Sequence, residues 1–257
     1  MFCSRTRTPS GLTVTSQIDK AAAESKAKEL AALFWERRHD FTFRNENYDA
    51  AQAMLIAYEA VLKKGERPVF VSDSGDNPTA GATGDATELL ECILDTIETA
   101  DKLPTPLFYS GFYDAPAAKA CVTAGIGAEL EISIGGNWDT VNGKKIPLKI
   151  RVEKIVQSYG PYLSDLVLVS YRNLRLVITS RHIGFGDPYL LPALMVKPEE
   201  YCLVVVKLGY LEPCFRKIAA RAIMATTRGC SNQLFHTIPF TRLIRPIFPI
   251  DTVDEWL

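Results

Sequence analysis

The sequence predicts a mixed α/β fold, in which flanking helices cover a mixed sheet that continues into an antiparallel β meander. Three observations support this class. The chain has 257 residues, 47% of them apolar and 23% charged, which is enough for a large apolar core. Its first half alternates segments of helical periodicity with short apolar runs, as βαβ units do. Residues 146–179 then change to a two-residue alternation, which is typical of antiparallel strands with one wet face.

The expected helices show apolar residues at three- and four-residue spacing together with signals at their ends. A polar residue (Asn45, Asn47 or Asp49) is expected to cap the second helix, and Gly65 to stop it. We expect helices over residues 18–38, from this cap to residue 64, and over 86–99, 116–124 and 213–224.

The expected strands are short apolar or alternating runs bounded by Gly, Pro or polar residues. They cover residues 68–71, 106–109, 129–134 and 203–206, with three further strands within 146–179. The tail contains Pro239, Pro246 and Pro249, which argues against a regular element there. We interpret residues 11–257 as one α/β domain and residues 1–10 as a ragged N-terminal remnant.

Composition excludes several classes of function. The net charge is −1, so the chain lacks the cationic excess of a general nucleic-acid binder. No apolar run reaches the roughly 18 residues of a membrane helix, and we expect no membrane partner. The six cysteines lie far apart without a CxxC pair, which excludes zinc fingers and thioredoxin-like motifs. A reducing compartment, the cytoplasm, is therefore expected.

The loop between the expected strand at 68–71 and the next helix is the main candidate site. Its glycines allow backbone N–H groups to approach a ligand, and sites in open α/β sheets lie after the carboxyl ends of strands. Two interpretations stay open: a binding loop, or a turn in which Asp85 caps the following helix. The candidate loop residues are Asp73, Asp76, Asn77, Gly81, Gly84 and Asp85.

Other chemistry-bearing residues give weaker signals. The three histidines, His39, His182 and His236, lack any zinc-binding spacing, and we predict no metal ligands in this chain. Between Lys207 and Arg245 there are seven Lys or Arg and one acid, Glu212. This basic strip fits an anion or an acidic partner as well as it fits a solvated helix face and tail.

Several motifs, in order along the chain, resemble the MlrC family, proteins similar to the enzyme that degrades linearised microcystin. Residues 76–85, DNPTAGATGD, are similar to the family's DNPGGGAPGD loop. Further similar segments are Leu33–Arg38, Gly125–Ala128, Ile134–Gly136, Val177–Arg181, Val204–Lys207 and Arg245–Asp251. The chain departs from the pattern at Thr79, Ala80 and Thr83, where the family has two glycines and a proline. It departs again after Lys207, where the family has Ser and then His-Phe.

The resemblance implies the C-terminal domain of a zinc metallopeptidase that hydrolyses small peptides such as linearised microcystin. The family's metal ligands lie in a larger N-terminal domain, so zinc is implied but is not expected to bind this chain alone. Catalytic residues stay unassigned. The 73–85 loop would bind substrate, with Arg181 and Lys207 as secondary candidates. Expected partners are a small peptide, the missing N-terminal domain and a second copy of the chain. The alternatives are a non-catalytic binding module and an incomplete gene product.

Overall fold

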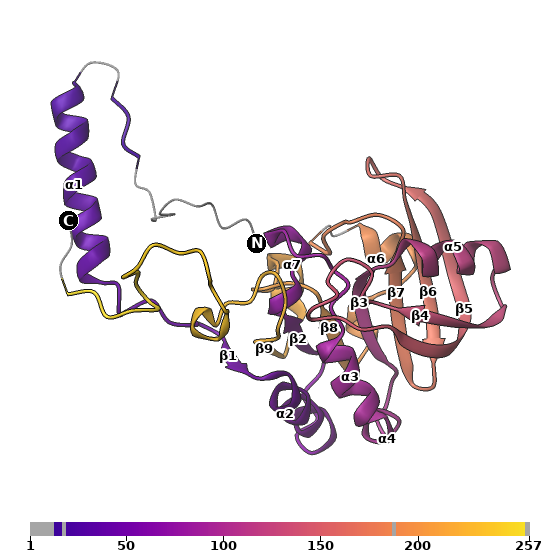
Figure 1. Ribbon diagram of the computed structural model, residues 1–257. Helices are drawn as coiled ribbons and strands as arrows, with labels where there is room; N and C mark the ends of the chain where they lie inside the picture. Colours follow the sequence, from indigo (N-terminus) through magenta and orange to yellow (C-terminus); the bar gives the residue numbers. More distant parts are fainter. Residues whose placement is uncertain (1–12, 17–18, 187–188, 255–257) are drawn as a thin grey trace. The chain divides into compact units, whose positions relative to one another are not determined.

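The computed structural model describes residues 13–16, 19–186 and 189–254, which divide into two compact units. One unit contains residues 45–233 and holds the sheet (Figure 1). The other combines the described residues before Asn45 with those from Leu234 onward. The predicted remnant at residues 1–10 lies outside the described residues, and the domain boundaries at 11 and 257 stay predictions.

The described part of the first unit forms a nine-stranded mixed sheet, in the order β1-β9-β2-β8-β3-β7-β6-β5-β4. Neighbours from β1 to β7 run parallel, whereas β7, β6, β5 and β4 pair antiparallel. This arrangement confirms the predicted mixed α/β sheet with its antiparallel meander. The strands are β1 Glu46–Tyr48, β2 Val69–Asp73, β3 Leu107–Tyr113, β4 Glu129–Ile134, β5 Ile146–Tyr159, β6 Ser164–Tyr171, β7 Leu174–Thr179, β8 Leu203–Val206 and β9 Arg221–Ala225.

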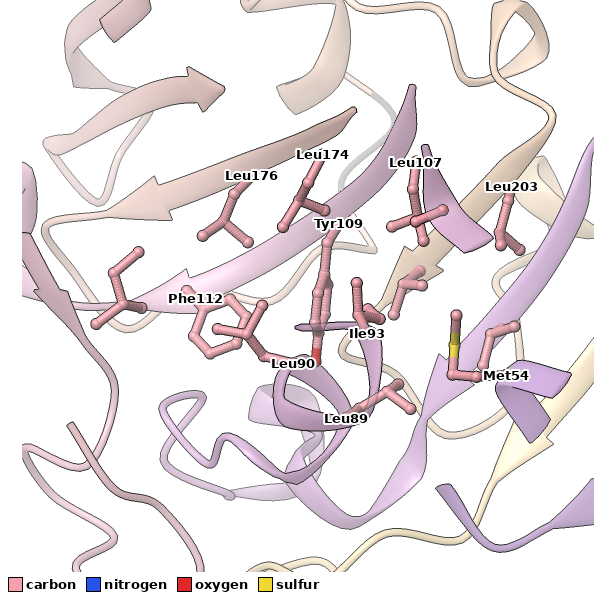
Figure 2. Close-up of a cluster of buried hydrophobic side chains, with 14 of the residues drawn as sticks. Met54, Leu89, Leu90, Ile93, Leu107, Tyr109, Phe112, Leu174, Leu176 and Leu203 are labelled. Carbon is pink, nitrogen blue, oxygen red and sulfur yellow. The ribbon is translucent and has the colours of Figure 1, made fainter. Parts of the chain in front are cut away.

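Helices cover both faces of this sheet. On one face lie α2 Ala50–Leu62, α3 Glu88–Asp95, α4 Ile97–Ala100 and α5 Ala115–Ala124. Figure 2 shows this core, where Leu89, Leu90 and Ile93 of α3 lie near the β3 side chains. The opposite face packs against α6 Leu190–Ala193 and α7 Pro213–Ile218. Strand β8 is therefore buried on both faces, which explains its uninterrupted apolar sequence.

Capping aspartates determine where two of these helices begin. Asp49, one of three predicted caps, accepts a hydrogen bond from the Gln52 N–H at 2.9 Å and starts α2. Asp114 caps α5 in the same way, through the Ala117 N–H at 3.0 Å. Both helices therefore begin within a few residues of their predicted positions.

Two helix predictions need correction. The helix expected over 213–224 ends at Ile218, and its second half is the strand β9. Residues 222–225 are apolar and buried between β1 and β2, where sheet pairing outweighs the helix propensity of Ala and Met. The helix expected over 86–99 is divided into α3 and α4 at Thr96, whose hydroxyl donates to the Cys92 carbonyl at 2.6 Å.

The second unit contains the helix α1 Lys20–Glu36, capped by Asp19. Its predicted start at residue 18 lies outside the described residues. Near its end, the Arg38 guanidinium lies 4.1 Å from the centroid of the Trp35 ring, which also meets Phe248 edge-on. The proline-rich tail forms turns and one short 3₁₀ turn, Phe235–Thr237, among its described residues. None of the helices in the described ranges is long and apolar enough to cross a membrane.

Candidate functional site

The candidate loop leaves the carboxyl end of β2 and meets residues from the two neighbouring strands, β8 and β9, and from β3 beyond β8. Asp73 is the last residue of β2, and Lys207 directly follows β8, which pairs with β2 in parallel. Tyr109 of β3 and Thr227, two residues beyond β9, reach the same place. Because parallel strands end at one edge of the sheet, residues separated by as much as 154 positions meet here.

Lys207 is the centre of this cluster. Its side chain is fully buried, and Nζ donates to Asp73 Oδ2 at 2.9 Å, Asp76 Oδ2 at 2.8 Å and the Ala86 carbonyl at 2.9 Å. Nζ also lies 4.3 Å from the centroid of the Phe112 ring. All three ammonium protons therefore have a partner, as a buried charge requires.

Burial and charge act in opposite directions on Lys207. Burial alone would lower its pKa, but the charges of Asp73 and Asp76, with their hydrogen bonds, raise the pKa above its usual value. The two aspartates therefore favour the charged form of Lys207 in the folded protein. Burial, followed by the charge of Asp73, also raises the pKa of Tyr109 well above its usual value. Tyr109 stays a neutral hydrogen-bond donor.

Of the two carboxylates beside Lys207, Asp73 connects the start of the loop to β3 and to the segment after β9, and Asp76 binds the end of the loop. Asp73 accepts from the Tyr109 hydroxyl and from the Thr227 hydroxyl, each at 2.6 Å. Asp76 accepts from the backbone N–H groups of Gly84 and Ala86, each at 2.8 Å. Both aspartates are at most 2% exposed. The structure therefore directs these predicted binding residues inward, where they hold the loop in one conformation.

Asp85 has the same kind of role at the other end of the loop. Its carboxylate accepts from the backbone N–H groups of three consecutive residues after β4: Asn137 and Trp138 at 2.6 Å, and Asp139 at 3.2 Å. Helix α3 begins instead after Thr87. The interpretation of Asp85 as a simple helix cap is therefore wrong, because its oxygens are occupied by a different turn.

The exposed part of the loop is its tip, Thr79–Gly81. Asn77 supports the tip from below, since its Oδ1 accepts from the Thr79 N–H at 3.0 Å and from the Thr79 hydroxyl at 2.7 Å. Gly81 has a φ of 87°, a left-handed conformation that favours glycine. Gly84 is also left-handed and is buried beside Pro78. Among the predicted loop residues, Gly81 alone is exposed.

A row of aromatic rings continues the surface from the loop. His182 Nε2 lies 2.6 Å from the Ala82 carbonyl, and its ring meets Tyr113 edge-on with 5.8 Å between centroids. Tyr113 in turn stacks on Trp138, which is 66% exposed. Neither Tyr113 nor Trp138 was predicted from the sequence. The signal that could have indicated Trp138 is its place directly after the turn Gly135–Asn137.

The secondary candidates separate in the structure. Lys207 joins the buried cluster, whereas Arg181 is exposed after β7 and donates through its backbone N–H to the Ser164 hydroxyl at 3.2 Å. The predicted basic strip is partly neutralised by acidic side chains, while its members Arg216, Lys217 and Arg242 are exposed. Besides buried Lys207, Arg221 pairs with Glu46 at 2.7 Å and Arg228 with Glu88 at 3.0 Å. Lys207 is therefore not part of a basic surface strip, because its charge is enclosed by the carboxylates of Asp73 and Asp76.

The carboxylates of the loop do not fit a zinc ion. Within the described ranges, no group of three or more His, Cys, Asp or Glu side chains is placed to hold a metal. Asp73 and Asp76 already share Lys207, and their oxygens accept from hydroxyl or backbone donors. A zinc ion there would have to displace a buried ammonium group with three hydrogen bonds.

Comparison with known proteins identifies related chains. The family model described as "MlrC C-terminus" matches residues 71–242, which include the loop and Lys207. Microcystinase C from Sphingomonas sp is 29% identical over 195 residues, covering 72% of this chain and 36% of the relative. A crystal structure from Mesorhizobium sp. BNC1, named provisionally as a metallopeptidase, has a TM-score of 0.68 and 22% identity. The match covers 92% of this chain and 47% of the chain in that crystal structure. This chain therefore spans less than half the length of either relative.

Proposed function

This chain belongs to the MlrC family through its C-terminal region, and we propose that it supplies the substrate-binding part of a zinc metallopeptidase acting on small peptides such as linearised microcystin. The family match over residues 71–242 supports a peptidase-like role. The observation that carries the proposal is the loop, whose carboxylates are enclosed while its tip, Thr79–Gly81, is exposed at the carboxyl edge of the sheet. Part of the proposal is a cytoplasmic location, predicted from the cysteine spacing.

In this proposal the loop binds substrate through its tip, and its aspartates act as supports. Asp73, Asp76 and Asp85 together accept hydrogen bonds from three hydroxyls, one ammonium group and five backbone N–H groups at distances of 2.6–3.4 Å. Such a loop loses little conformational entropy when a ligand binds, which favours affinity. The N–H groups of Thr79, Ala80 and Gly81 are bonded within the loop, so the exposed tip would offer its carbonyl oxygens to the N–H groups of a peptide main chain.

Zinc, where a peptidase of this kind binds it, polarises the scissile carbonyl and activates water. Because the described residues of this chain do not form a zinc ligand set, we assign the ligands to a further domain of the enzyme. This chain's residues then bind and orient the peptide. A homodimer and an N-terminal catalytic domain are both compatible partners in this proposal.

A second candidate function is a non-catalytic binding module. The observation that favours it is the enclosure of Lys207 and the loop aspartates, which leaves the tip and the neighbouring rings for recognition. The two candidates share a peptide-binding surface and differ in whether a further domain completes a catalytic site.

The test uses the full chain and linearised microcystin, with binding measured by isothermal titration calorimetry and cleavage by mass spectrometry. Ala80→Glu places a charge and bulk on the exposed tip, and we expect at least a tenfold loss of affinity, about 1.4 kcal/mol. Ala51→Glu is the matched control, since Ala51 is also exposed but lies on α2. Both variants should keep the wild-type melting temperature. Equal binding by wild type and Ala80→Glu would exclude the loop tip as the binding surface.

The cleavage assay tests whether the zinc ligands lie in a further domain or in this chain. We expect the chain alone to bind the peptide without cleaving it, with or without one equivalent of zinc. Cleavage that requires stoichiometric zinc would show that the ligands lie within this chain and would overturn that assignment.

A further inference from the structure

A groove of about 380 Å³ lies directly beside the loop tip, and it was not among the predicted sites. It connects to the loop through Thr79, which belongs to both. Its other walls come from the turn between β5 and β6 and from the segment that follows β7. The described lining residues are Thr79, Tyr159, Pro161, Tyr162, Ile183, Gly184, Gly186 and Leu190.

The groove is apolar and aromatic. Ile183 and Leu190 form a buried floor, with exposures of 5% and 1%, whereas Tyr162 stands at the rim and is 58% exposed. None of the described lining residues is Asp, Glu, Lys or Arg. Transferring a charged group into such a groove costs free energy because no charged side chain among the described lining residues compensates its lost hydration, whereas an apolar group gains by leaving water.

Glycines allow the groove to exist where its walls approach each other. A Cβ at Gly184 would lie 2.4 Å from Thr79 Cγ2, so any larger residue would press on the loop tip. A Cβ at Gly186 would lie 3.0 Å from Glu212 Oε1. The segment after β7 therefore lies close to the loop tip because it has no side chain at Gly184.

We propose that this groove is a subsite that binds an aromatic or branched apolar side chain of a short peptide. This inference rests on the proposed function, because the occupant is taken to be the peptide bound at the tip. The volume is at the lower end of ligand pockets, which suits one side chain with its adjoining peptide unit. The Tyr162 ring offers a face for stacking, and the Thr79 backbone brings the peptide main chain to the loop.

The subsite is tested with two small probes, N-acetyl-phenylalanine amide and N-acetyl-aspartate amide, titrated into the full chain and followed by NMR chemical shifts. We expect the phenylalanine probe to bind at least tenfold more tightly. Tyr162→Ser should remove most of this preference, and Tyr162→Phe should keep it, both without a change in melting temperature. Leu55→Ala is the matched control, because Leu55 is 59% exposed on α2.

The outcomes separate the subsite from the proposed function. If the chain binds linearised microcystin but binds both probes with equal affinity, the subsite is overturned and the proposed function still stands. A phenylalanine preference that depends on Tyr162, without any binding of linearised microcystin, supports the groove and refutes the proposed substrate. Failure of every ligand to bind refutes both, and a preference that Tyr162→Ser leaves intact places the apolar site elsewhere.

Discussion

Replacing Lys207 by Met tests whether the buried charge cluster holds the loop in place. Met has a similar length and no charge, so the substitution removes three hydrogen bonds of 2.8–2.9 Å without leaving a large cavity. Asp73 and Asp76 would then face each other inside the protein without their cation. Removing one partner of a buried ion pair costs about 3–5 kcal/mol. We expect a loss of this size in the free energy of unfolding at neutral pH.

The assay is equilibrium urea unfolding followed by circular dichroism. Lys119→Met is the matched control, because Lys119 is exposed on α5 and its loss should change the free energy of unfolding by less than about 0.5 kcal/mol. Adding Asp73→Asn to Lys207→Met removes one of the unpaired charges. The introduced amide would keep an oxygen for one hydroxyl and offer N–H groups to the other. The double variant should therefore be less destabilised than the sum of the two single variants.

Two results would refute this account of Lys207. One is a decrease of less than about 1 kcal/mol in the free energy of unfolding of Lys207→Met. A typical surface substitution, or the loss of one neutral hydrogen bond, has an effect of that size. The other is strict additivity of the two substitutions, which would mean that the ammonium group and Asp73 do not stabilise each other.

Three further substitutions probe the same unit through thermal or urea unfolding, and a fourth uses pH. Gly75→Ala should destabilise the protein by about 3 kcal/mol or prevent folding, because its Cβ would lie 2.0 Å from the Thr227 carbonyl oxygen. Gly81→Ala, whose Cβ meets no atom within 4 Å, should cost only about 1 kcal/mol for its left-handed backbone. Equal losses of stability in the two glycine variants would contradict the clash expected at Gly75. Asp85→Asn should cost about 1–3 kcal/mol, since one amide oxygen replaces two acceptors that bind three N–H groups. Burial raises the pKa of Cys121 from 9.0 to about 11, so its contribution to stability is complete below pH 9 and is lost as the pH rises to 11. Over that interval the wild type should lose more stability than Cys121→Ala, and parallel pH curves would show that the thiol is not responsible.

The sequence predicted most of the sheet, because its strands carry local signals. Residues 129–134 and 203–206 are strands within the predicted limits, the first through polar–apolar alternation and the second through an unbroken apolar run. Strand β9 was missed because the apolar run Ala222–Ala225 fits a buried helix turn equally well. Its strand state depends on pairing with β1 and β2, which lie far earlier in the chain, and β1 itself has only three residues.

The sequence also located the candidate loop but not the direction of its side chains. Asp73 and Lys207 are 134 residues apart, and nothing local indicates that they meet. Their contact follows only once β2 and β8 are known to be parallel neighbours, since each residue lies at the carboxyl end of its strand. The same holds for the Thr227 hydroxyl, which approaches Asp73 because β9 pairs with the other side of β2.

Two of the three differences between this loop and the family pattern fall on its exposed tip. The residues that agree with the pattern include Asp76, Gly84 and Asp85, all buried and hydrogen-bonded or closely packed. Thr79 and Ala80, which replace glycines, are exposed at the tip, and Thr83 is half-buried. A change on the tip alters which ligand fits, whereas a change in the support alters whether the loop folds. Under the proposed function, we therefore expect this chain to share the family's loop conformation and to differ from its relatives in the peptides that it prefers.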